Sequence, residues 1–295
     1  MALVAPFLLY PIFLINVLCF ALFACAFNLM MGFAGLLSFG HAAFFGGSAY
    51  VTAYAAKAWG WPAELSILAG LVTGGGLGVV FGWISIRRQG IYFGMVTMAL
   101  AQLVYFAALQ AKFTGGEDGI QGVPQRSALP MLDLTDNRVM YFYALAVFLA
   151  GFAVIYRTVH SPFGHVLRAI RENEGRAISL GYDVPRFKLL AFALSGALSG
   201  LAGGLKAIAL QIATLTDVEF TMSGEVVLMT LVGGVATLTG PVVGAAVVVA
   251  MLTYLAAFGV WVKALQGIIF IACVLAFRRG IVGEIAAMLE RSRQT

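Results

Sequence analysis

The 295-residue sequence is 61% hydrophobic and only 11% charged, with a mean hydropathy of +0.96. Soluble domains carry about 25% charged residues, so this composition excludes a soluble globular protein and predicts an integral membrane protein. In such a chain the distribution of Lys and Arg matters more than the net charge of +5, which is therefore no sign of nucleic-acid binding.

Apolar stretches recur along the whole chain. A spanning helix needs about 20 apolar residues. The sequence predicts nine spans, with uncertain edges, at 7–31, 36–56, 63–86, 90–111, 138–156, 189–212, 223–238, 241–259 and 263–277. The first is expected to be a retained span, because no basic segment precedes it and no cleavage site follows. The two spans around the Gly-rich stretch 233–241 are short, which leaves a re-entrant segment open. The predicted fold is all-α, a polytopic transmembrane bundle of about 8–10 spans in one membrane domain over residues 1–295.

Lys and Arg gather in a charged island at 157–188, which carries six basic and three acidic residues between apolar spans. With this island in the cytoplasm and the spans alternating, 12 of the 18 Lys and Arg residues fall inside. The positive-inside rule then places the N-terminus outside and the C-terminus in the cytoplasm.

The island itself has helical periodicity. Pro162 marks the first turn of a short helix, and Leu167 and Ile170 share its apolar face. Gly175 is expected to break this helix, and Gly181 to end a second short one. Two short cytoplasmic coupling helices between spans form a lever that a neighbouring motor protein can push.

Two further segments are expected outside the bundle. The outer loop 112–137 is rich in Gly, Pro and Asp and is predicted to be irregular. Its acidic, exposed part is either a contact for an external protein or a simple turn, and it contains Gly115, Gly116, Glu117 and Asp118. The tail from Ile281 has apolar residues at helical spacing and predicts an amphipathic helix on the inner membrane face or on a partner.

No group of side chains predicts catalysis or metal binding. The three histidines, His41, His160 and His165, lack metal-ligand spacing, and the three cysteines lie in apolar runs. There is no GxxxxGK[ST] loop, so the chain is expected to be no enzyme and to hold neither ATP nor another cofactor. Energy must come from another subunit or from an ion gradient. The few ionisable groups within the spans argue against an ion-coupled carrier.

Candidate residues for a translocation pathway are small or polar groups at membrane depth. The glycines mark places where helices approach or unwind, and unwound backbone is tolerated where it lines a cavity. For the polar groups, an interhelical hydrogen bond or plain packing is the alternative interpretation. Lys206 could instead snorkel, and Glu225 could belong to a solvated outer mouth. The candidates are Asn28, Gly32, Gly35, Ser38, Gly40, His41, Tyr92, Thr97, Lys206 and Glu225.

Several stretches in the same order resemble one family. The segment HSPFGHVLRAIRENEGRAISLGYDVPRFKLLAFALSGALSGLAGGL (160–205) resembles the coupling segment and following helix of the LivM-type permeases of bacterial branched-chain amino acid ABC transporters. NLMMGFAGLLSFGHAAFFGGSAY (28–50), TGGEDGIQGVP (114–124) and GGVATLTGPVVGA (233–245) resemble the family's Gly-rich signature, outer-loop motif and Gly-Pro turn. The matches cover nearly the whole chain, which is shorter at its N-terminus than the longest family members.

The resemblance implies a heteromeric importer in the bacterial inner membrane, with the N-terminus in the periplasm. A second, LivH-like permease would pair with this chain. Two ATP-binding cassette subunits, LivG- and LivF-like, would bind ATP and Mg, and a periplasmic binding protein would deliver substrate. The coupling segment would dock in a cleft on one ATPase through Arg168, Ala169, Ile170, Arg171, Glu172, Glu174, Gly175, Ala177, Gly181 and Asp183.

Three functions remain open from the sequence. The expected one is an ABC importer permease for branched-chain or other amino acids. The resemblance also allows the same machine to carry urea, short amides or aromatic carboxylates, because the binding protein decides this more than the permease does. An ion-coupled secondary carrier acting alone is the alternative from a different class.

Overall fold

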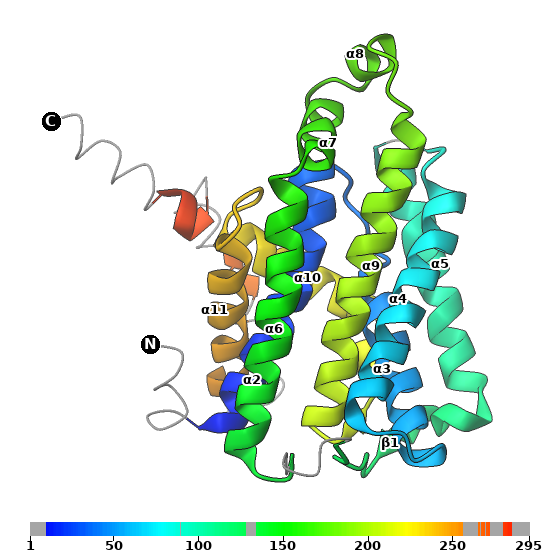
Figure 1. The fold of residues 1–295 in the computed structure, drawn as a ribbon, viewed down its shortest axis with the longest axis vertical. Helices are drawn as coiled ribbons and strands as arrows, with labels where there is room; N and C mark the ends of the chain where they lie inside the picture. Colours follow the sequence, from blue (N-terminus) through cyan, green and yellow to red (C-terminus); the bar gives the residue numbers. More distant parts are fainter. Residues whose placement is uncertain are drawn as a thin grey trace, which may run out of the picture.

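The computed structural model describes residues 10–88, 90–127, 134–255, 265, 267, 268, 270, 271 and 280–284. The described chain is a helical bundle whose long helices run roughly along one axis (Figure 1). The expected all-α membrane bundle is confirmed. Five described helices are long and apolar enough to cross a bilayer, namely Pro11–Ala34, Ala63–Ser85, Ile91–Gln110, Asn137–Val159 and Val184–Ala209. The predicted span 263–277 and the tail helix fall largely outside the described residues.

The elements alternate between long helices and short connections. The helices of the bundle are α2 (Pro11–Asn28), the π-helix η1 (Leu29–Ala34), α3 (His41–Ala58), α4 (Ala63–Ser85), α5 (Ile91–Gln110), α6 (Asn137–Val159), α9 (Val184–Ala209), α10 (Phe220–Gly233) and α11 (Gly240–Leu255). The short elements are η2 (Lys112–Thr114), η3 (Gly116–Asp118), β1 (Ile120–Gln121), α7 (Pro162–Glu172), α8 (Glu174–Ser179), β2 (Ile212–Ala213) and η4 (Leu215–Asp217).

Small residues let α4 and α9 pack closely in the centre of the bundle. A Cβ atom added at Gly74 would lie 2.8 Å from the Cα atom of Gly200, and one at Gly196 would lie 3.1 Å from that of Gly78. Such spacing leaves no room for a larger side chain in either helix. Small residues four positions apart on both helices are typical of such close helix contacts.

The predicted span 36–56 is wrong over its first residues. Residues 35–40 are not helical, and α3 begins only at His41. His41 contacts Ser195, which lies near the middle of the 26-residue α9, so α3 starts about half-way through the bundle. The break occurs because Gly35 adopts a φ of 72°, which ends η1 and turns the chain back into the bundle.

Helix α10 also begins at mid-depth. Ser223, in its first turn, contacts the first turn of α3. The preceding strand β2 pairs with β1 at the opposite end of the bundle from α7, with Ile120 opposite Ala213. The chain therefore climbs from that end through η4 before α10 starts. Helix α10 is only 14 residues long, as the short Gly-rich span predicted, and the described part of α11 runs from Gly240 to Leu255.

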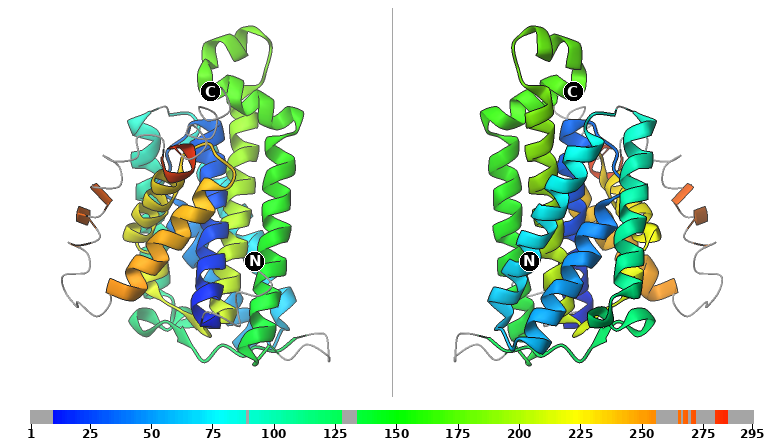
Figure 2. Two further views of the ribbon diagram at one scale, coloured as in Figure 1. Left: turned by 90° about the vertical axis from the view of Figure 1, so that its left-hand side faces the viewer. Right: turned by 90° about the vertical axis from the view of Figure 1, so that its right-hand side faces the viewer.

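The two ends of the bundle differ in character. Helices α7 and α8 project beyond the long helices at one end, while β1 and the loops around it cover the other (Figures 1 and 2). Helix α7 begins as predicted, with Pro162 in its first turn and Ser161 capping it. The predicted break at Gly175 is wrong. The break lies at Asn173, whose side chain caps α8, and Gly181 follows α8 with a φ of 87°.

Candidate functional site

The segment 35–40 links η1 to α3 as extended chain at membrane depth. Gly35 and Leu37 are exposed and Phe39 is partly exposed, while the residues between them are buried. This alternation is what an extended chain produces, because successive side chains point to opposite sides. One side of the segment therefore faces the core, and the other faces an opening in the bundle.

Side-chain hydroxyls replace the helical hydrogen bonds that this segment lacks. Gly40 N donates to Ser38 Oγ at 3.1 Å, and Phe39 N donates to Thr97 Oγ1 at 3.2 Å. Ser223 Oγ donates to the Phe39 carbonyl at 2.8 Å and accepts from the first turn of α3 at 3.0 Å. The candidate pathway residues Ser38 and Thr97 are thus buried supports of the segment, as is Ser223, which the sequence did not single out.

His41 lies in the packed core, in agreement with the alternative interpretation that it makes an interhelical packing contact. Its Nε2 atom lies 2.9 Å from Ser195 Oγ, which in turn donates to the Ala26 carbonyl at 2.6 Å. The imidazole is fully buried. Three aromatic rings surround it with centroids at 4.9, 5.3 and 5.9 Å, those of Phe27, Phe44 and Phe192.

Asn28 and Gly32 join the end of α2 and η1 to the turn 234–239 between α10 and α11. Asn28 Nδ2 donates to the Thr237 carbonyl at 2.7 Å, and its Oδ1 accepts from Ala236 N at 3.0 Å. A Cβ atom at Gly32 would lie only 2.7 Å from Ala236 N. These two candidate pathway residues therefore fasten two segments that are distant in sequence, and Asn28 is buried in doing so.

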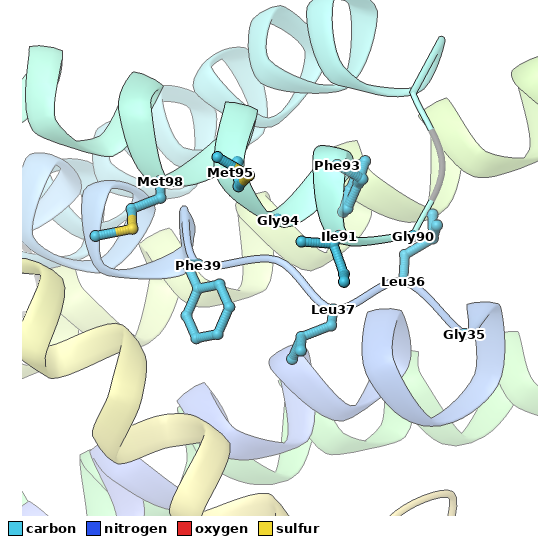
Figure 3. Close-up of a pocket in the computed structure, with 10 residues that line it drawn as sticks. All are labelled: Gly35, Leu36, Leu37, Phe39, Gly90, Ile91, Phe93, Gly94, Met95 and Met98. Carbon is cyan, nitrogen blue, oxygen red and sulfur yellow. The ribbon is translucent and has the colours of Figure 1, made fainter.

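A pocket of about 360 Å³ lies between the exposed side of segment 35–40 and the start of α5 (Figure 3). Of the candidate pathway residues, Gly35 lines it, whereas Tyr92 is 71% exposed on α5 and is not among the lining residues. Sequence reasoning missed the other lining residues because apolar side chains are the background of any membrane helix. The lining consists of Gly35, Leu36, Leu37, Phe39, Gly90, Ile91, Phe93, Gly94, Met95 and Met98.

Lys206 has a partner that the sequence did not reveal. Its Nζ atom forms an ion pair and hydrogen bond with Asp217 Oδ1, and it lies over the rings of Phe20 and Phe45 at 5.6 and 5.7 Å. This arrangement fixes η4 to α9 and the ammonium group faces no pocket described above. Glu225 is partly buried in α10, two residues after Ser223, which contacts the first turn of α3.

Helices α7 and α8 present a polar surface with an apolar tip. Ile170 and Ala177 are buried at 3% and 1% exposure, so these two proposed coupling residues face the interior of the projection. Glu174 is partly buried and pairs with Lys188 of α9 at 2.8 Å. The other proposed coupling residues are exposed, namely Arg168, Ala169, Arg171, Glu172, Gly175, Gly181 and Asp183. The sequence missed three large exposed apolar side chains at the tip, Ile178, Leu180 and Tyr182.

The acidic turn proposed to meet an external protein lies at the other end of the bundle. Gly115 and Gly116 both have positive φ values, 78° and 62°, and they fold the chain into η3. Glu117 and Asp118 are exposed there. The β1–β2 pair and the buried hydroxyl of Thr114, which donates to the Ala111 carbonyl, hold this turn against the bundle.

Comparison with known proteins places this arrangement in a family. Residues 10–274 match the family model described as "Branched-chain amino acid transport system / permease component". The chain is 29% identical to the high-affinity branched-chain amino acid transport permease LivM of Salmonella typhimurium and 28% identical to that of Escherichia coli. Both alignments cover 70% of this chain and 54% of the relative. It is 31% identical to a probable LivH permease of Methanocaldococcus jannaschii over 53% of this chain and 51% of the relative.

The chain spans about half the length of the curated relatives it matches. No solved structure matches it. The family model nevertheless covers nearly the whole chain, including the segment 35–40, α7, α8 and the turn 234–239. The resemblance seen in the sequence is confirmed, and the chain belongs to the family of membrane permease components of branched-chain amino acid transport systems.

Proposed function

We propose that this chain is the permease subunit of an ATP-driven importer that moves branched-chain amino acids, or small molecules like them, across the membrane. The segment 35–40 carries the proposal. Non-helical backbone at membrane depth is tolerated where protein covers it or where it lines a water-filled cavity, and not where it faces lipid. The exposed side of this segment therefore needs a pathway, a second subunit, or both.

The chemistry of the pocket supports an aliphatic cargo. Leucine, isoleucine, phenylalanine and methionine side chains surround it, and three glycines, Gly35, Gly90 and Gly94, widen it. An apolar side chain gains free energy in such a lining, at about 25 cal/mol for each Å² removed from water. The LivM relatives, which are branched-chain amino acid transport permeases, point to the same class of cargo.

The two ends of the bundle suit two kinds of partner. The exposed tip with Ile178, Leu180 and Tyr182 projects from the bundle on a basic segment, and apolar side chains in this position are typical of a docking surface. We assign this end to the cytoplasm and to two ATP-binding cassette subunits, which hydrolyse the ATP. The acidic turn at Glu117 and Asp118 would then meet the periplasmic binding protein, and a LivH-like permease would cover the pocket.

The same residues argue against an ion-coupled carrier acting alone. Lys206 and Asp217, the buried ionisable pair of the described bundle, neutralise each other and support η4. Groups that bind and release a coupling ion must instead be accessible to it during the cycle. An importer driven by other subunits needs no such group.

Uptake by the assembled transporter tests the proposal. We would express the chain with a LivH-like permease, two ATP-binding cassette subunits and a periplasmic binding protein from the same organism. Uptake of radiolabelled leucine would then be measured, with valine, isoleucine, urea and benzoate as competitors. Gly94→Leu fills the pocket, since a Cβ there meets only ordinary contacts with Leu37 and Phe39 at 3.5 Å. We expect at least a tenfold loss of uptake. The matched control is Gly76→Leu on the exposed face of α4, where a Cβ meets nothing within 4 Å.

Two results would refute the proposal. Unchanged leucine uptake in Gly94→Leu, with normal protein in the membrane, would remove the pocket from the pathway. Uptake by the purified chain alone, without ATPase subunits, would establish a self-sufficient carrier instead.

A further inference from the structure

Helix α7 lies directly against η1, and Arg171 makes the polar contact between them. Its guanidinium donates a hydrogen bond to the main-chain carbonyl of Gly32. In a continuous α-helix the amide of Leu36, four residues further along the chain, would donate to this carbonyl. Here Leu36 N donates to Met30 O at 3.0 Å. The guanidinium thus donates to a carbonyl at a helix end, where carbonyl groups lack intrahelical partners. Its positive charge also interacts favourably with the negative end of the helix dipole.

The rest of α7 packs around the same point. A Cβ atom at Gly35 would lie 2.8 Å from Arg171 Cγ, so the aliphatic part of the arginine rests on this glycine. The guanidinium of Arg168 lies 5.3 Å from the centroid of the Phe33 ring. Leu167 is fully buried in a cluster that includes residues of η1. Helix α7 therefore contacts residues on both sides of the point where η1 ends and the extended segment begins.

This point belongs to a connected set of contacts. Asn28 fastens the end of α2 to the turn 234–239, and Ser223 in α10 holds the far end of segment 35–40. Within the described part of the chain, no hydrogen bond other than that of Arg171 joins α7 to η1. Helix α8, in contrast, is tied to α9 through Glu174 and Lys188.

We propose that Arg171 is a positioning residue that transmits displacement of α7 to the segment 35–40, and through it to the pocket. The proposal rests on the proposed function, in which ATPase subunits displace α7 and α8. A shift of α7 would draw the Gly32 carbonyl with it and change the torsion angles at Gly35, the left-handed residue with which the segment begins. Leu37 and Phe39 line the pocket from that segment, so the pocket would change shape.

Transport and ATP hydrolysis, measured separately, test this role. Arg171→Met keeps the aliphatic part of the side chain and removes the guanidinium, and Arg171→Lys restores a positive donor. The matched control is Arg157→Met, which removes an exposed arginine at the end of α6. The resemblance implied that Arg171 docks on an ATPase, but its side chain contacts Gly32 and Gly35 of the bundle, and we infer that docking does not depend on it. In proteoliposomes with all partner subunits, we therefore expect Arg171→Met to copurify with the ATPases and hydrolyse ATP. Transport per ATP should fall at least tenfold, with partial rescue in Arg171→Lys and no change in Arg157→Met.

A labelling experiment follows the segment itself. In a background without the native cysteines, Leu37→Cys reports on the segment and Leu180→Cys on the tip of the projection. Trapping the complex with ATP and vanadate should change the maleimide labelling rates at both positions. With Arg171→Met, we expect the nucleotide-dependent change to vanish at position 37 and to persist at position 180, which a general loss of structure would not produce.

The outcomes separate the two proposals. Normal transport per ATP in Arg171→Met, or an unchanged nucleotide response at position 37, would overturn the role of Arg171. Loss of the ATPase subunits from Arg171→Met would also overturn it, and would assign the arginine to docking. Failure of the proposed function would show earlier, because the wild-type chain would then neither bind the ATPases nor transport in their presence.

Discussion

The buried ion pair between Lys206 and Asp217 allows a quantitative test of the packing around η4. The side chains are 12% and 2% exposed, so neither charge has much access to water. Lys206→Met keeps an unbranched side chain of similar length. It removes the cation, however, and leaves the Asp217 carboxylate buried without its partner.

The expected loss follows from the state of the remaining charge. Removing one member of a buried ion pair costs about 3–5 kcal/mol, because the other charge stays without its partner. The Thr214 hydroxyl donates to Asp217 Oδ2 at 3.1 Å in both forms, so this hydrogen bond does not change the difference, and the lower end of the range is expected because the carboxylate keeps one donor. We therefore expect the free energy of unfolding to fall by about 3 kcal/mol in Lys206→Met. In Lys206→Met/Asp217→Asn no charge is left unpaired, so the loss should be less than half the sum of the two single losses.

Reversible unfolding in mixed detergent micelles, followed by circular dichroism, measures these differences. Lys112→Met, at an exposed lysine near the same end of the bundle, should change stability by less than about 0.5 kcal/mol. If the two single losses simply add in the double variant, the two side chains do not interact and the reasoning fails. Leucine uptake by the double variant should stay near normal, because the pair supports the fold and does not line the pathway.

Three further predictions concern packing and orientation. Gly74→Val should lower the free energy of unfolding by at least about 2 kcal/mol in the same assay, because its Cβ would overlap the backbone of Gly200, and a stable variant would disprove that approach. Asn28→Leu, which removes the side-chain partner of two partly buried backbone groups in the turn 234–239, should cost about 2–4 kcal/mol, and a loss below about 1 kcal/mol would contradict these two hydrogen bonds. A cysteine at the exposed Arg126 should react with an impermeant maleimide on whole spheroplasts, and one at Ser179 only after the membrane is opened. The reverse pattern would invert the topology.

The long apolar helices and the two short helices of the charged island, α7 and α8, were predictable from the sequence, because the residue patterns that mark them are local. A polar or proline residue at a helix start and a glycine after its end act through neighbouring backbone groups, as Ser161, Pro162 and Gly181 do here. The small-residue faces of α4 and α9 were also visible in the sequence, although their pairing with each other was not. Glycines four residues apart, such as Gly74 and Gly78, lie on one face of any helix.

The supports of segment 35–40 and the pocket were not predictable in the same way. Ser38, Thr97 and Ser223 come from three separate parts of the chain, and no local pattern shows that their hydroxyls meet one backbone. For the same reason the partner of Lys206 was missed, since Asp217 lies beyond the end of α9 and returns only in the folded chain. The apolar pocket lining carries no distinguishing signal in a membrane helix.

The unwound state of segment 35–40 bears on how fast the proposed transporter would cycle. A continuous helix yields only by melting whole turns, a cooperative event with a costly restart. In segment 35–40 the helix is already interrupted. A few hydrogen bonds from side-chain hydroxyls, of about 1 kcal/mol each, take the place of the helical hydrogen bonds. Such bonds can break one at a time and re-form on a nearby partner. The activation barrier for rearranging the segment is therefore set by Ser38, Thr97 and Ser223 individually, so turnover could be tuned by single hydroxyl substitutions without altering the surrounding scaffold.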